Sequence, residues 1–166
     1  AKCSIAVEEG SLFVICDAGQ ISSKLVDSRF PSYEALIPKD SPHKLVLERK
    51  ALLDALKRVS IMSRDLTQGA ELHVSGGQME IRAEASELGG ARETIELTEN
   101  HEQPVRVGFN AQYLIQALDH IEEPRVVLNI GDSLSPGLIE PAGEKNFLAV
   151  IMPMRLNAPL NEDELK

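Results

Sequence analysis

The chain has 166 residues, of which 43% are hydrophobic and 26% charged, and its formal net charge is −9. This length suits one ordinary domain, or one domain and part of another, with a sizeable core. The acidic balance excludes a general nucleic-acid binder held by surface cations, although it leaves room for a local basic face. With no Trp, two Tyr and four Phe, the chain offers no aromatic platform for stacking single-stranded bases.

Membrane and secretory signals are not found in the sequence. No apolar run approaches the roughly 20 residues that a membrane-spanning helix needs, and the start, AKCSIAVEEG, lacks the basic and apolar regions of a signal peptide. We therefore expect a cytoplasmic protein without membrane contact. Cys3 and Cys16 have neither metal-ligand spacing nor a secretory context, which favours two reduced thiols over a disulfide.

The first part of the chain reads as short strands. Residues 4–26 alternate apolar runs with turn signals such as Glu9-Gly10, which predicts three successive antiparallel strands. Three strands without a helix do not make a domain, so we expect residues 1–38 to hold the last strands of an incomplete domain and an interdomain segment. Pro31 and Pro38 impose extended or turn geometry on that segment.

A strand, helix, three-strand pattern then occurs twice within residues 39–156, which we expect to form one complete domain. The first copy predicts a strand over 44–47, a helix over 48–63 and strands near 70–75, 78–84 and 92–98. The second predicts a strand over 105–109, a helix over 111–121 and strands near 125–130, 136–140 and 147–152. Gly76-Gly77 is expected to form a hairpin turn, and Asn110 to cap the second helix.

The two copies also share residues. LLDAL begins at Leu52 and LIQAL at Leu114, 62 positions apart, which indicates a duplicated unit, with chance similarity of two Leu- and Ala-rich helices as the alternative. Each helix has one apolar stripe to bury against a sheet. The economical architecture is an α+β domain with two helices side by side on eight antiparallel strands.

The run FLAVIMPMRL, from Phe147 to Leu156, is the most apolar in the chain. Its six leading residues predict a strand buried on both faces, and Pro153, which has no N–H, ends that strand or confines it to a sheet edge. Met152 and Met154 have flexible side chains that suit a surface able to repack around partners. The alternative is a core strand in which the methionines are filler.

The sequence predicts neither an enzyme nor a cofactor or metal site. No phosphate-binding, dinucleotide-binding or nucleophile motif occurs, and the histidines at 43, 73, 101 and 120 lie in unrelated settings. Basic residues concentrate in the predicted helix near 48–65. Such a charge run suits a nucleic-acid contact, or simply a solvated helix face.

Four runs carry a resemblance to a known family. They are SKLVDSRFPSY from Ser23, VGFN from Val107 with Tyr113 and Leu114 after it, DSLSP from Asp132 and VIMPMRL from Val150. In this order and spacing, over nearly the whole chain, they resemble the bacterial sliding clamps, the β subunits of DNA polymerase III. The resemblance implies the DNA-clamp (processivity) fold, in which each domain is a duplicated strand, helix, three-strand unit. It also implies three domains per protomer and two protomers closed head to tail around duplex DNA.

The implied function is a non-enzymatic processivity factor. In the family, polymerase subunits, the clamp loader and repair proteins dock short linear motifs, such as Gln-Leu-x-Leu-Phe, into a groove between the middle and last domains. Carried over by position, the groove residues are Pro31, Leu36, Asn110, Tyr113, Leu134, Pro136, Val150, Ile151, Met152, Pro153, Met154 and Arg155.

The resemblance also implies DNA and protomer contacts. Weak, sequence-independent contacts with duplex DNA are expected from Arg29, Lys57, Arg58 and Arg64, and ring closure from Ile61 and Met62. The alternative function is a truncated clamp fragment that acts as a stand-alone interaction or regulatory module and binds clamp protomers or partners without forming a ring. Residues 157–166 are expected to be a flexible tail, or a weak internal competitor for the groove through Leu160 and Leu165.

Overall fold

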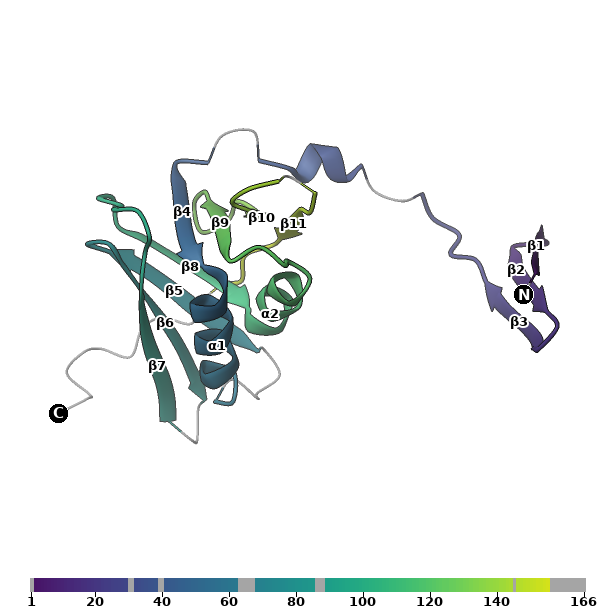
Figure 1. The fold of residues 1–166 in the computed structure, drawn as a ribbon, viewed down its shortest axis with the longest axis horizontal. Helices are drawn as coiled ribbons and strands as arrows, with labels where there is room; N and C mark the ends of the chain where they lie inside the picture. The colour runs from purple at the N-terminus through teal and green to yellow at the C-terminus, as the bar shows by residue number, and fades with distance from the viewer. Residues whose placement is uncertain are drawn as a thin grey trace. The chain divides into compact units, whose positions relative to one another are not determined.

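The computed structural model describes residues 2–29, 32–38, 41–62, 68–85, 89–144 and 146–155. The chain forms two compact units, Ala1–Tyr33 and Glu34–Lys166. Figure 1 labels the strands and the α-helices of both units.

The first unit is a three-stranded antiparallel sheet in the order β1-β2-β3. Its strands are β1 (Cys3–Glu8), β2 (Ser11–Cys16) and β3 (Gly19–Lys24), which confirms the three predicted strands. The turn between β1 and β2 places Glu9 and Gly10 at φ of 48° and 74°. This left-handed conformation is inexpensive for Gly10 because it has no Cβ.

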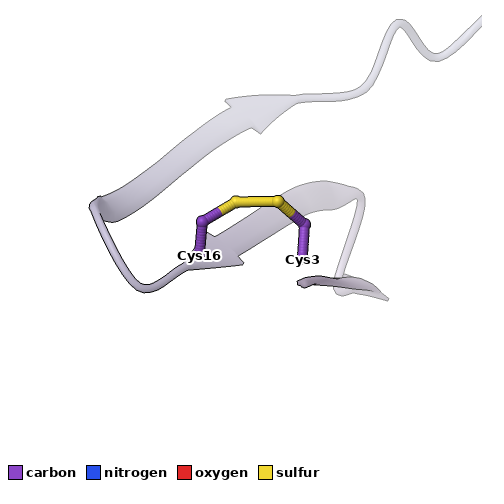
Figure 2. Close-up of a disulfide and its surroundings, with 2 residues drawn as sticks. All are labelled: Cys3 and Cys16. Carbon is purple, nitrogen blue, oxygen red and sulfur yellow. A yellow bond between two sulfur atoms is a disulfide. The ribbon is translucent and has the colours of Figure 1, made fainter. Parts of the chain in front are cut away.

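A disulfide joins Cys3 and Cys16, so the prediction of two reduced thiols is wrong. Figure 2 shows the bond crossing from one strand to the next. The two residues are register partners on β1 and β2, with Cα atoms 4.5 Å apart. Directly opposed antiparallel residues whose Cα atoms lie this close fall within the range that a disulfide can bridge.

From Tyr33 onward, the described residues form one short 3-10 helix, two α-helices and eight strands. In chain order they are η1 (Tyr33–Leu36), β4 (His43–Glu48), α1 (Arg49–Val59), β5 (Gly69–Ser75), β6 (Gln78–Ala85), β7 (Gly89–Glu96), β8 (Val105–Asn110), α2 (Ala111–Asp119), β9 (Arg125–Ile130), β10 (Gly137–Pro141) and β11 (Ala149–Ile151). The strands form two four-stranded sheets, β11-β10-β9-β4 and β7-β6-β5-β8. All their pairings are antiparallel, so the predicted α+β architecture is confirmed.

Each copy of the repeat contributes its first strand to the sheet of the other copy. β4 begins the first copy of the repeat but pairs with β9 of the second, and β8 begins the second copy but pairs with β5 of the first. Backbone hydrogen bonds repeat the relation: the N–H of Arg49 donates to Pro124, just before β9, and the N–H of Ala111 donates to Gln68, just before β5. The predicted duplication is therefore confirmed in the backbone as well as in the element order.

The helices bury their apolar stripes in a single core. α1 contacts β6 and β7, α2 contacts β8 and β11, and the two helices lie side by side (Figure 1). Leu52, Leu56, Leu114 and Leu118 are almost fully buried between the helices and the sheets. Each such leucine contributes about 1.5 to 3 kcal/mol relative to its exposed state, so these side chains hold the helices on the sheets.

Arg49 fastens the start of α1 to the end of α2. Its guanidinium donates to the carbonyls of Leu118 (3.1 Å) and Glu123 (3.2 Å). The Leu118 carbonyl belongs to the last turn of α2, where a cation complements the helix dipole and satisfies an unpaired acceptor. This basic residue therefore has a structural role.

Several predicted bounds differ from the structure. α1 ends at Val59, and the Ser60 hydroxyl donates to the Lys57 carbonyl (2.9 Å), so the predicted continuation to residue 63 is wrong. Residues 33–36 form a 3-10 turn. The prediction for this segment was extended or turn geometry and did not specify a 3-10 turn. β11 is a three-residue edge strand whose Val150 is half-buried, so the prediction of a strand buried on both faces is wrong. Among the described helices, none is long and apolar enough to cross a membrane.

Candidate functional site

An open cavity of about 590 Å³ lies in the second unit. Three segments far apart in the sequence form its wall: the residues at and after η1, the loop between β9 and β10, and the end of β11. The lining residues are Ala35, Leu36, Ile37, Pro38, Pro42, Gly131, Asp132, Ser135, Pro136 and Met152. Of the predicted groove residues, the cavity therefore brings together Leu36, Pro136 and Met152.

A tight loop forms one side of the cavity. The Asp132 carboxylate accepts hydrogen bonds from the backbone N–H groups of Leu134 (2.9 Å) and Ser135 (2.7 Å). A hydrogen bond from the Ser135 side chain and those from the two backbone N–H groups keep the pKa of Asp132 below its ordinary value, because they favour the charged form. The loop leaves Leu134 69% exposed. The hydrogen bonds to Asp132 thus fix the backbone of this loop so that the Leu134 side chain is exposed to solvent.

The segment after β11 crosses from one sheet to the other. Val150 of β11 pairs with Leu138 of β10, and the N–H of Met154 donates to the carbonyl of Gly108 in β8 (2.8 Å). Pro153 lies between them, after the last residue of β11, in agreement with the prediction that it ends or edges the strand. Ile151 is buried, whereas Met152 is 57% exposed and lines the cavity.

Asn110 and Tyr113 lie at the start of α2. The Asn110 side chain accepts from the N–H groups of Gln112 (2.9 Å) and Tyr113 (3.3 Å), which confirms the predicted N-cap. One turn into the helix, Tyr113 is 58% exposed. These two residues, with Leu134, Val150, Ile151, Pro153, Met154 and Arg155, do not line the cavity. Pro31 lies outside the described residues.

Of the cations predicted to contact DNA, the two on α1 form ion pairs with carboxylates. Lys57 pairs with Asp119 of α2 (3.1 Å), and Arg58 forms two hydrogen bonds with Glu93 of β7 (2.7 and 3.1 Å). Because of that paired geometry, the pKa of Glu93 lies below its ordinary value and that of Arg58 above. Arg29 is exposed in the first unit, and Arg64 lies outside the described residues.

The predicted ring-interface residues follow the end of α1. Ile61 is 59% exposed, and Met62 is half-buried. β7, which contacts α1, ends its sheet and has β6 as its single strand neighbour among the described residues. Its other edge carries backbone N–H and C=O groups that no described strand pairs.

The structure also joins two histidines that the sequence placed in unrelated settings. His43 Nδ1 and His101 Nε2 are 2.9 Å apart, and the rings meet edge to face. Burial and the neighbouring His101 lower the pKa of His43. The residues are 58 positions apart, so no local motif reveals the pair. Within the described part of the chain, no group of three or more His, Cys, Asp or Glu residues could hold a metal ion.

Residues 34–155 match the family model of the DNA polymerase III beta subunit, C-terminal domain. The chain belongs to this family. It is 36% identical over 135 residues to the beta sliding clamp of Pseudomonas putida, an alignment that covers 81% of this chain and 36% of the relative. The beta sliding clamp of Escherichia coli K12 is 34% identical over 135 residues, with 81% and 37% covered.

Solved structures of the family share the fold. A DNA polymerase sliding clamp from Pseudomonas aeruginosa, solved with a ligand, superposes with a TM-score of 0.77 at 30% identity, covering 93% of this chain and 42% of that one. A sliding clamp from Bartonella birtlesii bound to griselimycin gives 0.77 at 28% identity, covering 93% and 41%. The chain thus spans less than half the length of the relatives it matches.

Proposed function

We propose that this chain serves as part of a sliding-clamp protomer and docks short linear peptides of its partners at the cavity and the neighbouring apolar surface. The observation that carries the proposal is the meeting of Leu36, Pro136 and Met152 in one cavity of a clamp-family domain. The partners would be polymerase subunits, the clamp loader and repair proteins. The peptide-binding surface is defined here as the cavity together with Leu134, Tyr113 and Met154.

The chemistry of this surface suits apolar peptide side chains. Leu36, Pro136 and Met152 offer aliphatic contact in the cavity, while exposed Leu134 and Tyr113 lie outside it. A peptide Leu or Phe buried here would contribute about 1.5 to 3 kcal/mol. Once the ordering of the peptide is subtracted, an affinity near micromolar, about −8 kcal/mol, is reasonable.

In the proposed role, the protein encircles duplex DNA in the cytoplasm through weak contacts and carries out no chemical step. Because Lys57 and Arg58 are paired with carboxylates, their attraction for phosphates is reduced, which suits contacts that allow sliding. Exposed Ile61 and the outer edge of β7 offer a surface to another protomer. The same surface would also serve a stand-alone module that binds clamp protomers without closing a ring. Sedimentation with a full-length clamp distinguishes closed rings from a capped protomer.

The peptide site is tested by fluorescence anisotropy with a labelled Gln-Leu-x-Leu-Phe peptide. We expect Met152→Ala and Tyr113→Ala each to weaken binding about 5- to 30-fold, because each removes 1 to 2 kcal/mol of apolar contact. Ile61→Ala is the matched control, since it truncates an equally exposed apolar side chain elsewhere in the same unit. A peptide that does not bind, or that binds all three variants equally, contradicts the proposal.

A further inference from the structure

Among the described residues that line the cavity, one side chain is ionisable. Of these ten described residues, Asp132 alone carries a charge, and the others are apolar apart from Gly131 and Ser135. Among the described residues no Lys, Arg or His forms an ion pair with Asp132. A ligand in the cavity therefore meets aliphatic contact and one negative charge that has no described counter-ion.

The position and charge of this carboxylate are both fixed. Backbone N–H groups of Leu134 and Ser135 hold it in place, so it loses little conformational freedom when a ligand arrives. Hydrogen bonds from the Ser135 side chain and these N–H groups lower the pKa of Asp132, which leaves the carboxylate ionised across the neutral range. The side chain is also exposed, so a ligand cation can reach it without first being buried.

We propose that Asp132 is a specificity-determining residue that favours peptides carrying Lys or Arg beside the apolar residue that enters the cavity. The inference rests on the proposed peptide docking and adds the charge of the partner segment. An ion pair at an exposed site has a modest strength. We expect about a 2- to 5-fold preference for a Lys peptide over the matching Gln peptide, and the opposite sign for Glu.

The experiment uses the whole chain and a set of Gln-Leu-x-Leu-Phe peptides. Lys, Gln or Glu is placed at the variable third position and at each residue flanking the motif, and dissociation constants are measured by anisotropy at low and high salt. Asp132→Asn removes the charge, while its side-chain carbonyl can still accept from Leu134 and Ser135. Glu96→Gln is the matched control, because it removes one exposed charge from β7 in the other sheet.

The expected result is a Lys-over-Glu preference at one position or more that Asp132→Asn abolishes and Glu96→Gln leaves in place. High salt should reduce the preference in the wild-type chain, since screening shortens the reach of exposed charges to about 10 Å at 0.1 M.

Peptides that bind with the same Lys-to-Glu ratio in the wild type and Asp132→Asn overturn this inference and leave the peptide site standing. Equal losses in both variants also overturn it, because they point to the net charge of −9. Absence of all peptide binding overturns the peptide site and, with it, this inference. The wild-type salt series decides the matter if Asp132→Asn does not fold, since a ratio that ignores salt contradicts an ion pair.

Discussion

At the residue scale, the hydrogen bond between His43 and His101 needs one ring nitrogen to act as the acceptor. A protonated imidazole has two donors and no acceptor, so two protonated rings cannot keep this bond. The pair joins the start of β4 to the segment between β7 and β8. Protonation of both rings therefore weakens a contact between distant parts of the chain.

The lowered pKa of His43 sets the direction of the pH dependence. Below the ordinary value of about 6.5, the unfolded chain binds more protons at this site than the folded chain does, so the free energy of unfolding falls as pH drops from there toward the folded pKa. We expect urea denaturation to show a smaller loss of stability between pH 7.5 and pH 5 in His101→Gln than in the wild type. His120→Gln, at the exposed end of α2, should retain the wild-type loss. Parallel curves for all three proteins would contradict this expectation.

At the scale of elements, the two helices begin with the same backbone but different caps. Glu48 and Asn110 have φ, ψ of −67°, 116° and −67°, 117°, yet only Asn110 caps its helix with its side chain. The duplication has thus retained the geometry of the N-cap and changed the residue. Glu48 stands where a short acceptor side chain is preferred.

Exchanging the caps should move stability in opposite directions. We expect Asn110→Ala to lower the free energy of unfolding by about 1 kcal/mol, because two N–H groups lose their acceptor. Glu48→Asn should raise it by about 0.5 to 1 kcal/mol, since its backbone already matches a capped start. Glu48→Ala serves as the control and should change little. Urea denaturation measures all three, and a destabilised Glu48→Asn would argue against equivalent helix starts.

The three-stranded sheet of the first unit depends on its disulfide. Ile5, Val7 and Ile21 are exposed in this unit, so hydrophobic burial supports it weakly. A cross-link that closes a loop of about 15 residues contributes about 3 kcal/mol by restricting the unfolded chain. In the reducing cytoplasm that we propose for this protein, the thiol form would compete with it.

Reduction should loosen this sheet selectively. We expect dithiothreitol, or the Cys3→Ser, Cys16→Ser double variant, to accelerate amide hydrogen exchange in β1 and β2 at least 10-fold. Amides of α2 are the internal control and should not change. Unchanged protection in β1 would show that the strand pairing alone holds the sheet.

At the scale of the whole molecule, the spacing of apolar residues predicted the helices and the repeat, whereas contacts between residues far apart in the sequence were not predicted. Leu52 and Leu114 lie in segments long enough to show a helical pattern, and their 62-residue spacing pointed to the repeat. The sequence does carry a signal for the disulfide, because Cys3 and Cys16 lie equally far from the Glu9-Gly10 turn and therefore face each other in a hairpin. The His43–His101 contact had none, because it depends on how two distant segments pack.

Some residues of the candidate site were predicted from the sequence and others were not. The resemblance named Leu36, Pro136 and Met152, which the fold brings into one cavity. It did not name Asp132 or Ser135, although both stand in the DSLSP run that carried the resemblance. The role proposed for Asp132 follows from a side chain that accepts hydrogen bonds from its own loop, a geometry that the sequence alone does not specify. The assignment of partners to this cavity stays a prediction.

The exchange of β4 and β8 makes the two halves of the second unit depend on each other. Each half gives its first strand to the other sheet, so removing either half leaves the other with an open strand position and an uncovered core. The Met154 to Gly108 bond and the corresponding Thr98 to Val46 bond then join each sheet back to the other. The segment that carries Met152, beside the cavity, is therefore hydrogen-bonded to both sheets of the core. If a peptide docks as proposed, a force on it is transmitted to both sheets rather than to one loop.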